Sequence, residues 1–392
     1  MAEMNGFSIV DGSEFGDRQA ANRAYLELIN EAFGFNEAGE DFARLLPKLF
    51  GPSRDPASCT TFAVDSSDGR LLACAGRFPV TFYLGDKPVK AFGIGNVCAR
   101  KELRNMGLMS QVMKAAVERM IEDGAVFSFL GGSRHRYSHF GFERTGVAYK
   151  FDLSEKTLKK LAAEDLPAYV LKPLAAEDGA ALRFIAGCDC RQWRANRGAA
   201  DMFDTLSSWH AAPYVLYKNS RPCGWAVIQD GRKVTEAVTV DPTDNLPLLS
   251  LLGRLHSPLT VRIPEYDIGL FDALLPLAEN WRTGADNCFN VLNYKALLSV
   301  MMELKAGCSK LADGCLDVVV NGIARTESLR IEVKNGKPSV SVLSDTANAL
   351  KLSHKDAMCL FFNRGLPLSR SLDPAPASWF PLPLYVSSPD DV

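Results

Sequence analysis

The segment RNMGLM, residues 104–109, contains residue types that can bind an anion at the start of a helix. Apolar side chains recur after it at spacings of three and four residues, which predicts an amphipathic helix. The first amides of a helix lack intrahelical partners and carry the positive end of its dipole, and a glycine lets a phosphate approach closely. The amides from Asn105 to Met109, around Gly107 and with Arg104 as a charged clamp, could therefore hold a diphosphate.

A purely structural turn would explain the same residues, because glycine is common at the start of helices. The sequence has neither G-x-G-x-x-G nor G-K-[ST], which excludes the dinucleotide fingerprint and the P-loop. Spacing alone leaves the structural turn and the diphosphate site both open.

The elements around this turn predict a mixed sheet with helices packed against it. Helical spacing appears twice before the sheet, and the second of these helices is broken near Pro47. Two β-rich runs joined by Ser67, Asp68 and Gly69 predict an antiparallel hairpin. The resulting order α-α-β-β-β-α-β indicates a mixed α/β unit, closed by a final strand, GVAYKFDL, near residue 153.

A second block repeats this order of elements in its pattern, with little identity. Asp241 and Asp244 stand where the first block has its basic, glycine-containing turn. Acidic side chains there would repel a pyrophosphate, so we expect this block not to bind one. The last block has a helix, strands with Asn-Gly turns, a helix with Ser353 as its N-cap, and a proline-rich tail.

Composition narrows the class of protein. With a net charge of −2, the chain lacks the excess of basic residues that drives binding to nucleic acid. No export signal or membrane-spanning run is visible, which predicts a cytoplasmic protein without a membrane partner. The ten cysteines are scattered, and the close pair Cys188 and Cys190 lacks a second pair at zinc spacing, so no metal site is expected.

Two motifs resemble those of the GNAT acyltransferases. VCARKELRNMGLMSQVM is similar to the acetyl-coenzyme A (acetyl-CoA) loop of that family, although Met109 replaces a small residue and Lys101 replaces a common proline. FLGGSRHRYSHFGFE is similar to the family's strand, short helix and Y-x-x-F-G-F ending. Over nearly its full length the chain resembles the Eis-like (enhanced intracellular survival) acetyltransferases.

The resemblance implies two tandem GNAT-like mixed-sheet domains followed by a sterol-carrier-protein-like α+β domain, often in a hexamer. The expected boundaries are 1–153 for the catalytic domain, 154–287 for a degenerate GNAT-like domain without a coenzyme A loop, and 288–392 for the last domain. The tail of the last domain would return to the active site.

The resemblance also implies roles for individual residues. The cofactor-binding residues would be Val97, Cys98, Ala99, Arg104, Asn105, Met106, Gly107, Leu108, Met109 and Ser133. Tyr137 would be the general acid, since a phenol with a pKa of about 10 is protonated at neutral pH. A tyrosine packed under Phe140 and Phe142, with its hydroxyl on a carbonyl, is the structural alternative. The α-carboxylate of Val392 would be the base, and Asp390 and Asp391 would lie near an incoming cation.

These expectations together describe an N-acetyltransferase. It would transfer acetyl from acetyl-CoA directly to a primary amine of an aminoglycoside-like or polyamine-like small molecule, or to lysine. The alternative is a non-catalytic protein, either a coenzyme A sensor or a carrier that binds an apolar ligand or lipid in its C-terminal domain.

Overall fold

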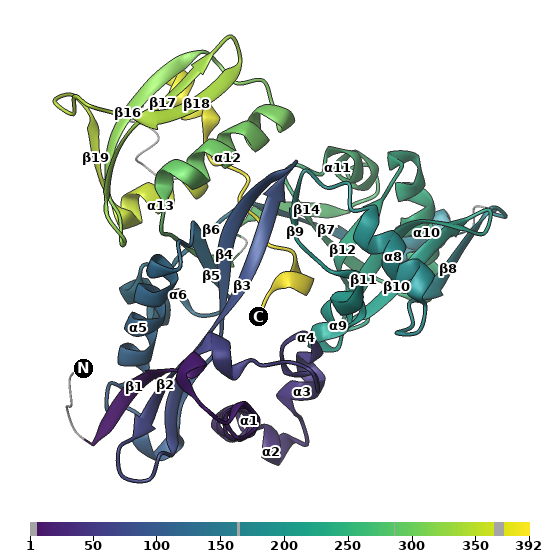
Figure 1. Cartoon of the computed structure of the whole chain (residues 1–392). Coiled ribbons are helices and arrows are strands. Elements are labelled where there is room, and N and C mark those ends of the chain that lie inside the picture. The colour runs from purple at the N-terminus through teal and green to yellow at the C-terminus, as the bar shows by residue number, and fades with distance from the viewer. Residues whose placement is uncertain (1–5, 163–164, 286, 364–371) are drawn as a thin grey trace.

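The computed structural model describes residues 6–162, 165–285, 287–363 and 372–392, which form three β-sheets with helices packed on them (Figure 1). The mixed α/β class predicted from the order of elements is confirmed. None of the helices in the described ranges has the length and hydrophobicity needed to cross a membrane.

The first sheet has the strand order β1-β2-β3-β4-β5-β15-β6, with β9 paired to β3. The strands are β1 (Phe7–Asp11), β2 (Thr60–Asp65), β3 (Leu71–Leu84), β4 (Lys87–Ala99), β5 (Phe127–Leu130), β6 (Glu143–Thr145), β9 (Trp193–Ala195) and β15 (Asn287–Val291). The predicted hairpin is confirmed, because β2 and β3 pair antiparallel across a turn in which Gly69 has a φ of 76°. Strands β4 and β5 are parallel, and the helix after β4 connects them.

The helices of this unit are α1 (Arg18–Phe33), α2 (Phe35–Ala38), α3 (Phe42–Leu45), α4 (Pro47–Phe50), α5 (Leu108–Glu122) and α6 (Arg134–Tyr137). The break predicted near Pro47 separates α3 from α4. The stripe predicted for α5 is also confirmed, because Leu108, Val112, Ala116 and Met120 are all buried. This apolar face fixes α5 on the sheet and leaves its first turn beside the end of β4.

The second sheet has the order β14-β7-β13-β12-β11-β10-β8. Its strands are β7 (Ala148–Leu153), β8 (Tyr169–Pro173), β10 (Ala212–Lys218), β11 (Arg221–Gln229), β12 (Lys233–Thr239), β13 (Leu259–Pro264) and β14 (Asn280–Gly284). The helices of this unit are α7 (Glu155–Ala162), α8 (Gly179–Gly187), α9 (Met202–Ser207), α10 (Asn245–Leu255) and α11 (Ile268–Leu274).

Two strands lie in other sheets than the sequence indicated. We expected β7 to close the first sheet, but it pairs with β13 and β14 of the second sheet, because the chain turns at Gly146, whose φ is 82°. We assigned almost all of β15 to the last block, but it inserts between β5 and β6 of the first sheet, where its whole run is buried. The division into three domains remains a prediction. In the structure, β7 belongs to the second sheet and β15 to the first.

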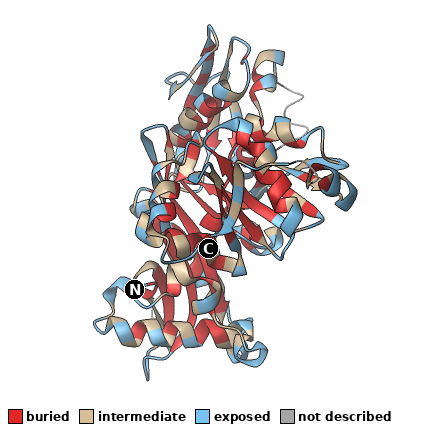
Figure 2. Cartoon of the chain, turned by 90° about the vertical axis from the view of Figure 1, so that its right-hand side faces the viewer, coloured by how far each residue is buried: buried red, intermediate tan, exposed pale blue. Residues whose placement is uncertain are grey.

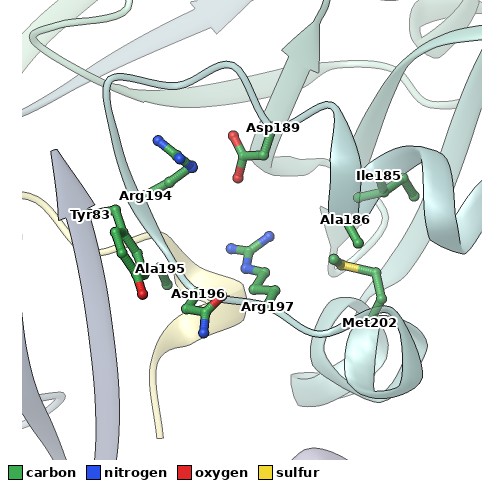
Figure 3. A pocket seen from close by; sticks show the side chains of 9 residues that line it. All are labelled: Tyr83, Ile185, Ala186, Asp189, Arg194, Ala195, Asn196, Arg197 and Met202. Atoms are coloured by element: carbon green, nitrogen blue, oxygen red, sulfur yellow. The ribbon is translucent and has the colours of Figure 1, made fainter. Parts of the chain in front are cut away.

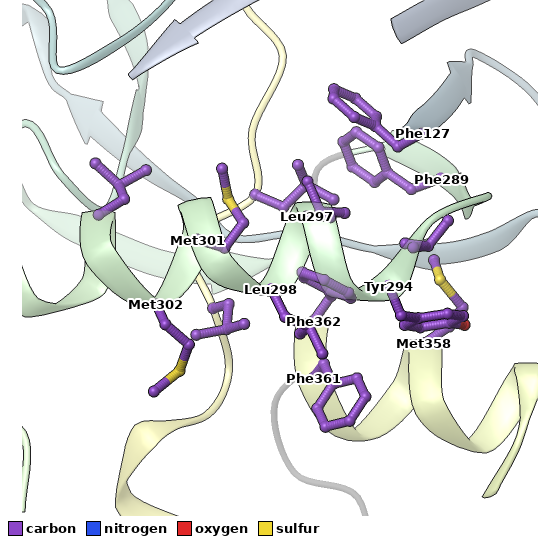
Figure 4. Close-up of a cluster of buried hydrophobic side chains, with 14 of the residues drawn as sticks. Phe127, Phe289, Tyr294, Leu297, Leu298, Met301, Met302, Met358, Phe361 and Phe362 are labelled. Carbon is purple, nitrogen blue, oxygen red and sulfur yellow. The ribbon is translucent and has the colours of Figure 1, made fainter. Parts of the chain in front are cut away.

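The third sheet has the order β18-β17-β16-β19. Its elements are α12 (Tyr294–Cys308), β16 (Gly314–Asn321), β17 (Thr326–Lys334), β18 (Lys337–Val342), β19 (Leu350–Ser353) and α13 (His354–Phe362). Ser353 caps α13, as predicted, by accepting a hydrogen bond from the amide of Asp356. Figure 4 shows apolar side chains of α12 and α13 in one cluster that also includes Phe127 and Phe289 of the first sheet, so the two units share a core.

The C-terminal segment, residues 380–392, follows α14 (Pro374–Trp379) and runs into the middle of the molecule (Figure 1, Figure 2). Leu382, Leu384 and Tyr385 are buried in it. Its main chain is held on both sides, since Leu384 accepts a hydrogen bond from the amide of Val147 and Tyr385 accepts one from the indole of Trp193. The end of the chain is therefore fixed to both the first and the second unit.

Candidate active site

Strand β4 loses one of its two neighbours along its length. Its pairing with β5 ends at Gly93 and Phe129, whereas its pairing with β3 continues to Ala73 and Ala99. The main chain from residue 94 to residue 99 therefore borders an opening in the sheet. This splayed edge includes Val97, Cys98 and Ala99, which we predicted to bind the cofactor, and an extended ligand can add to it as a strand would.

A bulge lies in the middle of this edge. The register between β3 and β4 shifts between Cys74 and Gly76, opposite Asn96, whose φ is 55°. The side-chain Oδ1 of Asn96 is buried and has no hydrogen-bond partner within the described residues. A left-handed non-glycine residue and an unpaired buried acceptor both cost stability, and such features collect at functional sites.

The turn after β4 presents amides at the start of α5. It consists of the 3₁₀ helix η3 (Lys101–Leu103) and two left-handed residues, Asn105 with a φ of 69° and Gly107 with a φ of 81°. Gly107 is the N-cap of α5, and no side chain in the described part of the chain caps this helix. A Cβ atom at Gly107 would have nothing within 4 Å, so the first amides of α5 are open to a bulky anion.

A cavity of about 800 Å³ lies beside this turn and the β4 edge. The predicted cofactor residues that line it are Val97, Cys98, Ala99, Arg104, Asn105, Gly107, Leu108 and Met109. Met106 does not line it, and its side chain is 62% exposed. Sequence reasoning missed Phe33 at the end of α1 and the side chains of Arg136, His139 and Phe140.

A smaller pocket of about 270 Å³ adjoins this cavity. Tyr137, Ser133 and Val392 all line it, so the structure brings together the residues predicted as acid and base, together with one that we assigned to the cofactor. Phe33, Val97 and Arg136 line both cavities. The splayed edge of β4 is therefore where the two spaces meet.

Tyr137 ends the short helix α6, and its ring lies against Gly132. Its side chain is buried, with the ring of Phe142 edge-on at 6.5 Å. Burial raises the pKa of Tyr137 above its ordinary value, while the guanidinium of Arg136 acts in the opposite direction. The phenol is therefore protonated at neutral pH and can donate a proton or a hydrogen bond into the pocket.

Val392 lies on two glycines of β4. A Cβ atom at Gly93 would overlap the Cγ2 atom of Val392, and one at Gly95 would lie 3.0 Å from its carbonyl carbon. Glycine at these positions allows the main chain of the C-terminal segment to approach the β4 edge next to Asn96.

Buried ion pairs from the second unit hold the residues before Val392. The guanidinium of Arg197 donates to both carboxylate oxygens of Asp390, at 2.7 and 2.8 Å, and to both of Glu236 on β12, at 2.8 Å. Burial disfavours both charges, but the opposite charges outweigh it, so the pKa of Arg197 is raised and that of Glu236 is lowered. Figure 3 shows Arg197 in a pocket of about 210 Å³ beside the C-terminal segment.

This pairing corrects one prediction. We expected Asp390 to lie near an incoming cation, but its carboxylate is buried against Arg197 and lines neither cavity. Its charge is compensated inside the protein, so the structure shows Asp390 holding the segment and does not place it at either cavity.

Lys48 at the start of α4 fixes the last residues from the other side. Its ammonium donates to the carbonyl oxygens of Pro389, at 2.6 Å, and of Asp391. Burial lowers the pKa of Lys48 to about 8. Burial also raises the pKa of Asp391, and the charge of Lys48 partly offsets this effect. Asp391 accepts a hydrogen bond from the amide of Val392, and its role toward a substrate remains a prediction.

The second unit has a different turn at the corresponding place. Between β12 and α10 lies the 3₁₀ helix η7 (Pro242–Asp244), whose N-cap Asp241 accepts hydrogen bonds from Thr243. Asp244 is buried and accepts hydrogen bonds from the ammonium of Lys218 and the hydroxyl of Tyr169. Carboxylates occupy the region where the first unit has open amides.

Residues 18–145 match the family model of the acetyltransferase (GNAT) domain. This part of the chain is an acetyltransferase domain. The match includes the β4 edge, the turn before α5 and Tyr137, whereas Val392 and Trp209 come to the site from outside the matched residues. The chain is therefore an acyltransferase, and domains of this kind use acetyl-CoA as the acyl donor.

Solved structures share the fold over most of the chain. The GCN5-related N-acetyltransferase from Kribbella flavida is 16% identical with a TM-score of 0.59, over 88% of this chain and 86% of that one. Eis1 from Mycobacterium abscessus is 13% identical with a TM-score of 0.63, over 98% and 100%. A probable N-acyltransferase from Enterococcus faecalis V583 is 15% identical with a TM-score of 0.63, over 89% and 88%. Among curated proteins, none matches the sequence.

Proposed function

We propose that this acyltransferase moves acetyl from acetyl-CoA directly to a primary amine. One observation carries the proposal. The cavity of about 800 Å³ beside the open amides of α5 and the pocket of about 270 Å³ lined by Tyr137 share Val97 on the splayed edge of β4. A donor in the first space and an acceptor in the second can therefore meet at one point, as direct transfer requires.

The donor side follows from the turn and the strand edge. The amides around Gly107 and the side chain of Arg104 hold the pyrophosphate of acetyl-CoA, and the main chain from Val97 to Ala99 binds its extended arm as an added strand. A main-chain amide there polarises the thioester carbonyl, and such donors are worth about 3–4 kcal/mol of transition-state stabilisation.

The proton transfers fall to groups in the smaller pocket. The α-carboxylate of Val392 accepts a proton from the ammonium of the acceptor, which makes the amine nucleophilic. The phenol of Tyr137 donates a proton to the departing thiolate, a role that suits its burial and raised pKa.

The remaining features of the proposal rest on the resemblance to Eis-like proteins. Residues 288–392 would be the sterol-carrier-protein-like domain, residues 154–287 the degenerate domain, and the assembly a hexamer in the cytoplasm. The buried core that the last unit shares with the first supports a rigid connection between the two.

Release of coenzyme A thiol from acetyl-CoA by the full chain, measured with a panel of primary amines, tests the proposal. We expect amine-dependent thiol release and a stoichiometric acetylated amine by mass spectrometry. Tight binding of coenzyme A without turnover of any amine would instead support the coenzyme A sensor. Bound acyl chains or sterol in the purified protein, without turnover, would support the lipid carrier.

A further inference from the structure

The smaller pocket has an aromatic wall. The rings of Phe35 and Phe42 are stacked with centroids 4.5 Å apart, and Phe33 lies edge-on to Phe42 at 5.2 Å. Trp209 and Leu46 line the same pocket. Aromatic faces bind flat apolar groups and also attract a nearby cation, so this wall suits a ring that carries a short amine chain.

The charges around the pocket disfavour a substrate with several positive charges. None of the described residues that line it is Asp or Glu, and its charged groups are the cation Arg136 and the α-carboxylate of Val392. An oxygen of the Asp391 carboxylate lies 3.5 Å from the position that a Cβ atom would take at the lining residue Gly131.

Glu40, which precedes the wall residue Phe42 by two positions, has a side chain that is 32% exposed and pairs with His210 and Arg44. A polycation would need several compensating carboxylates when its charges leave water, whereas the lining of the pocket supplies the single carboxylate of Val392, which suits one ammonium group.

The size of the pocket also favours a small acceptor. Its volume of about 270 Å³ lies below the roughly 300–1,000 Å³ of sites for drug-sized molecules. It can accept one ring with a short chain, whereas a molecule of several sugar rings would have to remain largely outside. The ring would lie on the wall at Phe35 and Phe42, and the chain would place its amine at the junction beside Val97.

We propose that the acceptor is a primary monoamine joined by a short chain to an aromatic ring, bound on the wall formed by Phe33, Phe35 and Phe42. This inference rests on the acetyltransferase function proposed above. It departs from the aminoglycoside or polyamine acceptors that the resemblance implied, because the lining provides aromatic faces in place of acidic side chains.

The test compares three amines with the full chain at constant acetyl-CoA. Phenethylamine has a ring and one charge, butylamine lacks the ring, and spermidine has several charges. We expect kcat/KM for phenethylamine to exceed that for each of the others by at least about tenfold, since apolar contacts of this kind discriminate by roughly 10- to 200-fold. A preference for spermidine, or equal values for all three, would overturn the inference and leave the acetyltransferase function standing. Turnover of none of these three but of another primary amine in the panel described above would overturn the inference alone, and turnover of no amine in that panel would overturn both.

Two variants locate the selectivity. Phe35→Ala should lower kcat/KM for phenethylamine roughly tenfold and change that for butylamine little, because only the ring loses its partner. Phe33→Ala should act in the same direction, and it is a safer variant for folding because Phe33 is 48% exposed. Trp281→Ala, an exposed aromatic residue on β14, is the matched control and should leave the ratio unchanged. Equal losses with both amines in both wall variants would contradict the proposed wall.

Discussion

Arg197 and Asp390 form a two-point ion pair, with guanidinium nitrogens 2.7 and 2.8 Å from the carboxylate oxygens. Arg197 belongs to the second unit, whereas Asp390 lies two residues before Val392. The second unit, which has carboxylates at the turn before α10, therefore contributes to the active site by holding the C-terminal segment at the edge of β4.

Replacing Arg197 should release this segment. In Arg197→Ala we expect a loss of about 3–5 kcal/mol in the free energy of unfolding, because Asp390 stays buried without this partner. Glu236, by contrast, retains its ion pair with Arg191. Turnover with acetyl-CoA and amine should fall more than coenzyme A affinity does. Urea unfolding, calorimetric binding and the thiol assay measure the three quantities.

Arg282→Ala is the matched control for this variant. Arg282 pairs with Asp152 at 2.7 Å, but its side chain is 55% exposed, compared with 5% for Arg197. An exposed pair is worth about 0–1 kcal/mol, so stability and turnover should change little. Equal effects of the two variants would show that burial of the Arg197 pair has no special role.

Removing the hydroxyl of Tyr137 tests its role as acid. Tyr137→Phe keeps the ring against Gly132, so coenzyme A affinity should be retained, while kcat should fall roughly ten- to a thousandfold. Steady-state kinetics and calorimetric binding separate the two effects. Tyr83→Phe, in a different pocket, is the control. An unaltered kcat in Tyr137→Phe would remove this residue from the mechanism.

Adding a methyl group at Gly95 should displace Val392. The new Cβ atom would lie 3.0 Å from the carbonyl carbon of Val392, closer than ordinary contact, so the end of the segment has to move. We expect Gly95→Ala to lower kcat by about tenfold, since a small misplacement of a catalytic group is costly. Gly187→Ala at the end of α8 has nothing within 4 Å and should keep full activity. A fully active Gly95→Ala enzyme would argue against a role for Val392 in the reaction.

The lowered pKa of Lys48 predicts a pH dependence of stability. The pKa is about 8 in the folded protein and 10.5 in an unperturbed lysine, so the unfolded chain binds more protons between these values. The contribution of Lys48 to the free energy of unfolding therefore rises as pH increases from about 8 to 10.5.

Lys48→Met abolishes this contribution. Urea unfolding of both proteins at several pH values should show the wild type gaining stability relative to the variant across that window. Taking the difference cancels the other groups that titrate there. A difference that stays constant or shrinks with rising pH would contradict the assignment.

Much of the local structure could be predicted from neighbouring residues in the sequence. The apolar spacing of α5, the hairpin at Gly69 and the cap of α13 all depend on neighbours within a few residues, and each is confirmed. The positions of β7 and β15 were wrong for the opposite reason. Their pairing partners are distant in sequence, and a short apolar run fits either sheet equally well.

The candidate site likewise has a part formed by residues adjacent in the chain and a part formed by residues that are distant in it. Gly107 and the open start of α5 could be recognised from the sequence, because a strand, a turn and a helix adjacent in the chain form them. The sequence by itself therefore determined the open helix start at which we predict that an anion binds, and the resemblance of its motifs to a family indicated Tyr137. Only the tertiary structure decided that Arg197 and Lys48 fix the C-terminal segment, that Asp390 is neutralised, and that Phe33, Phe35 and Phe42 form an acceptor wall free of acidic side chains. These relationships join side chains from separate units, and no local pattern encodes the distance between them.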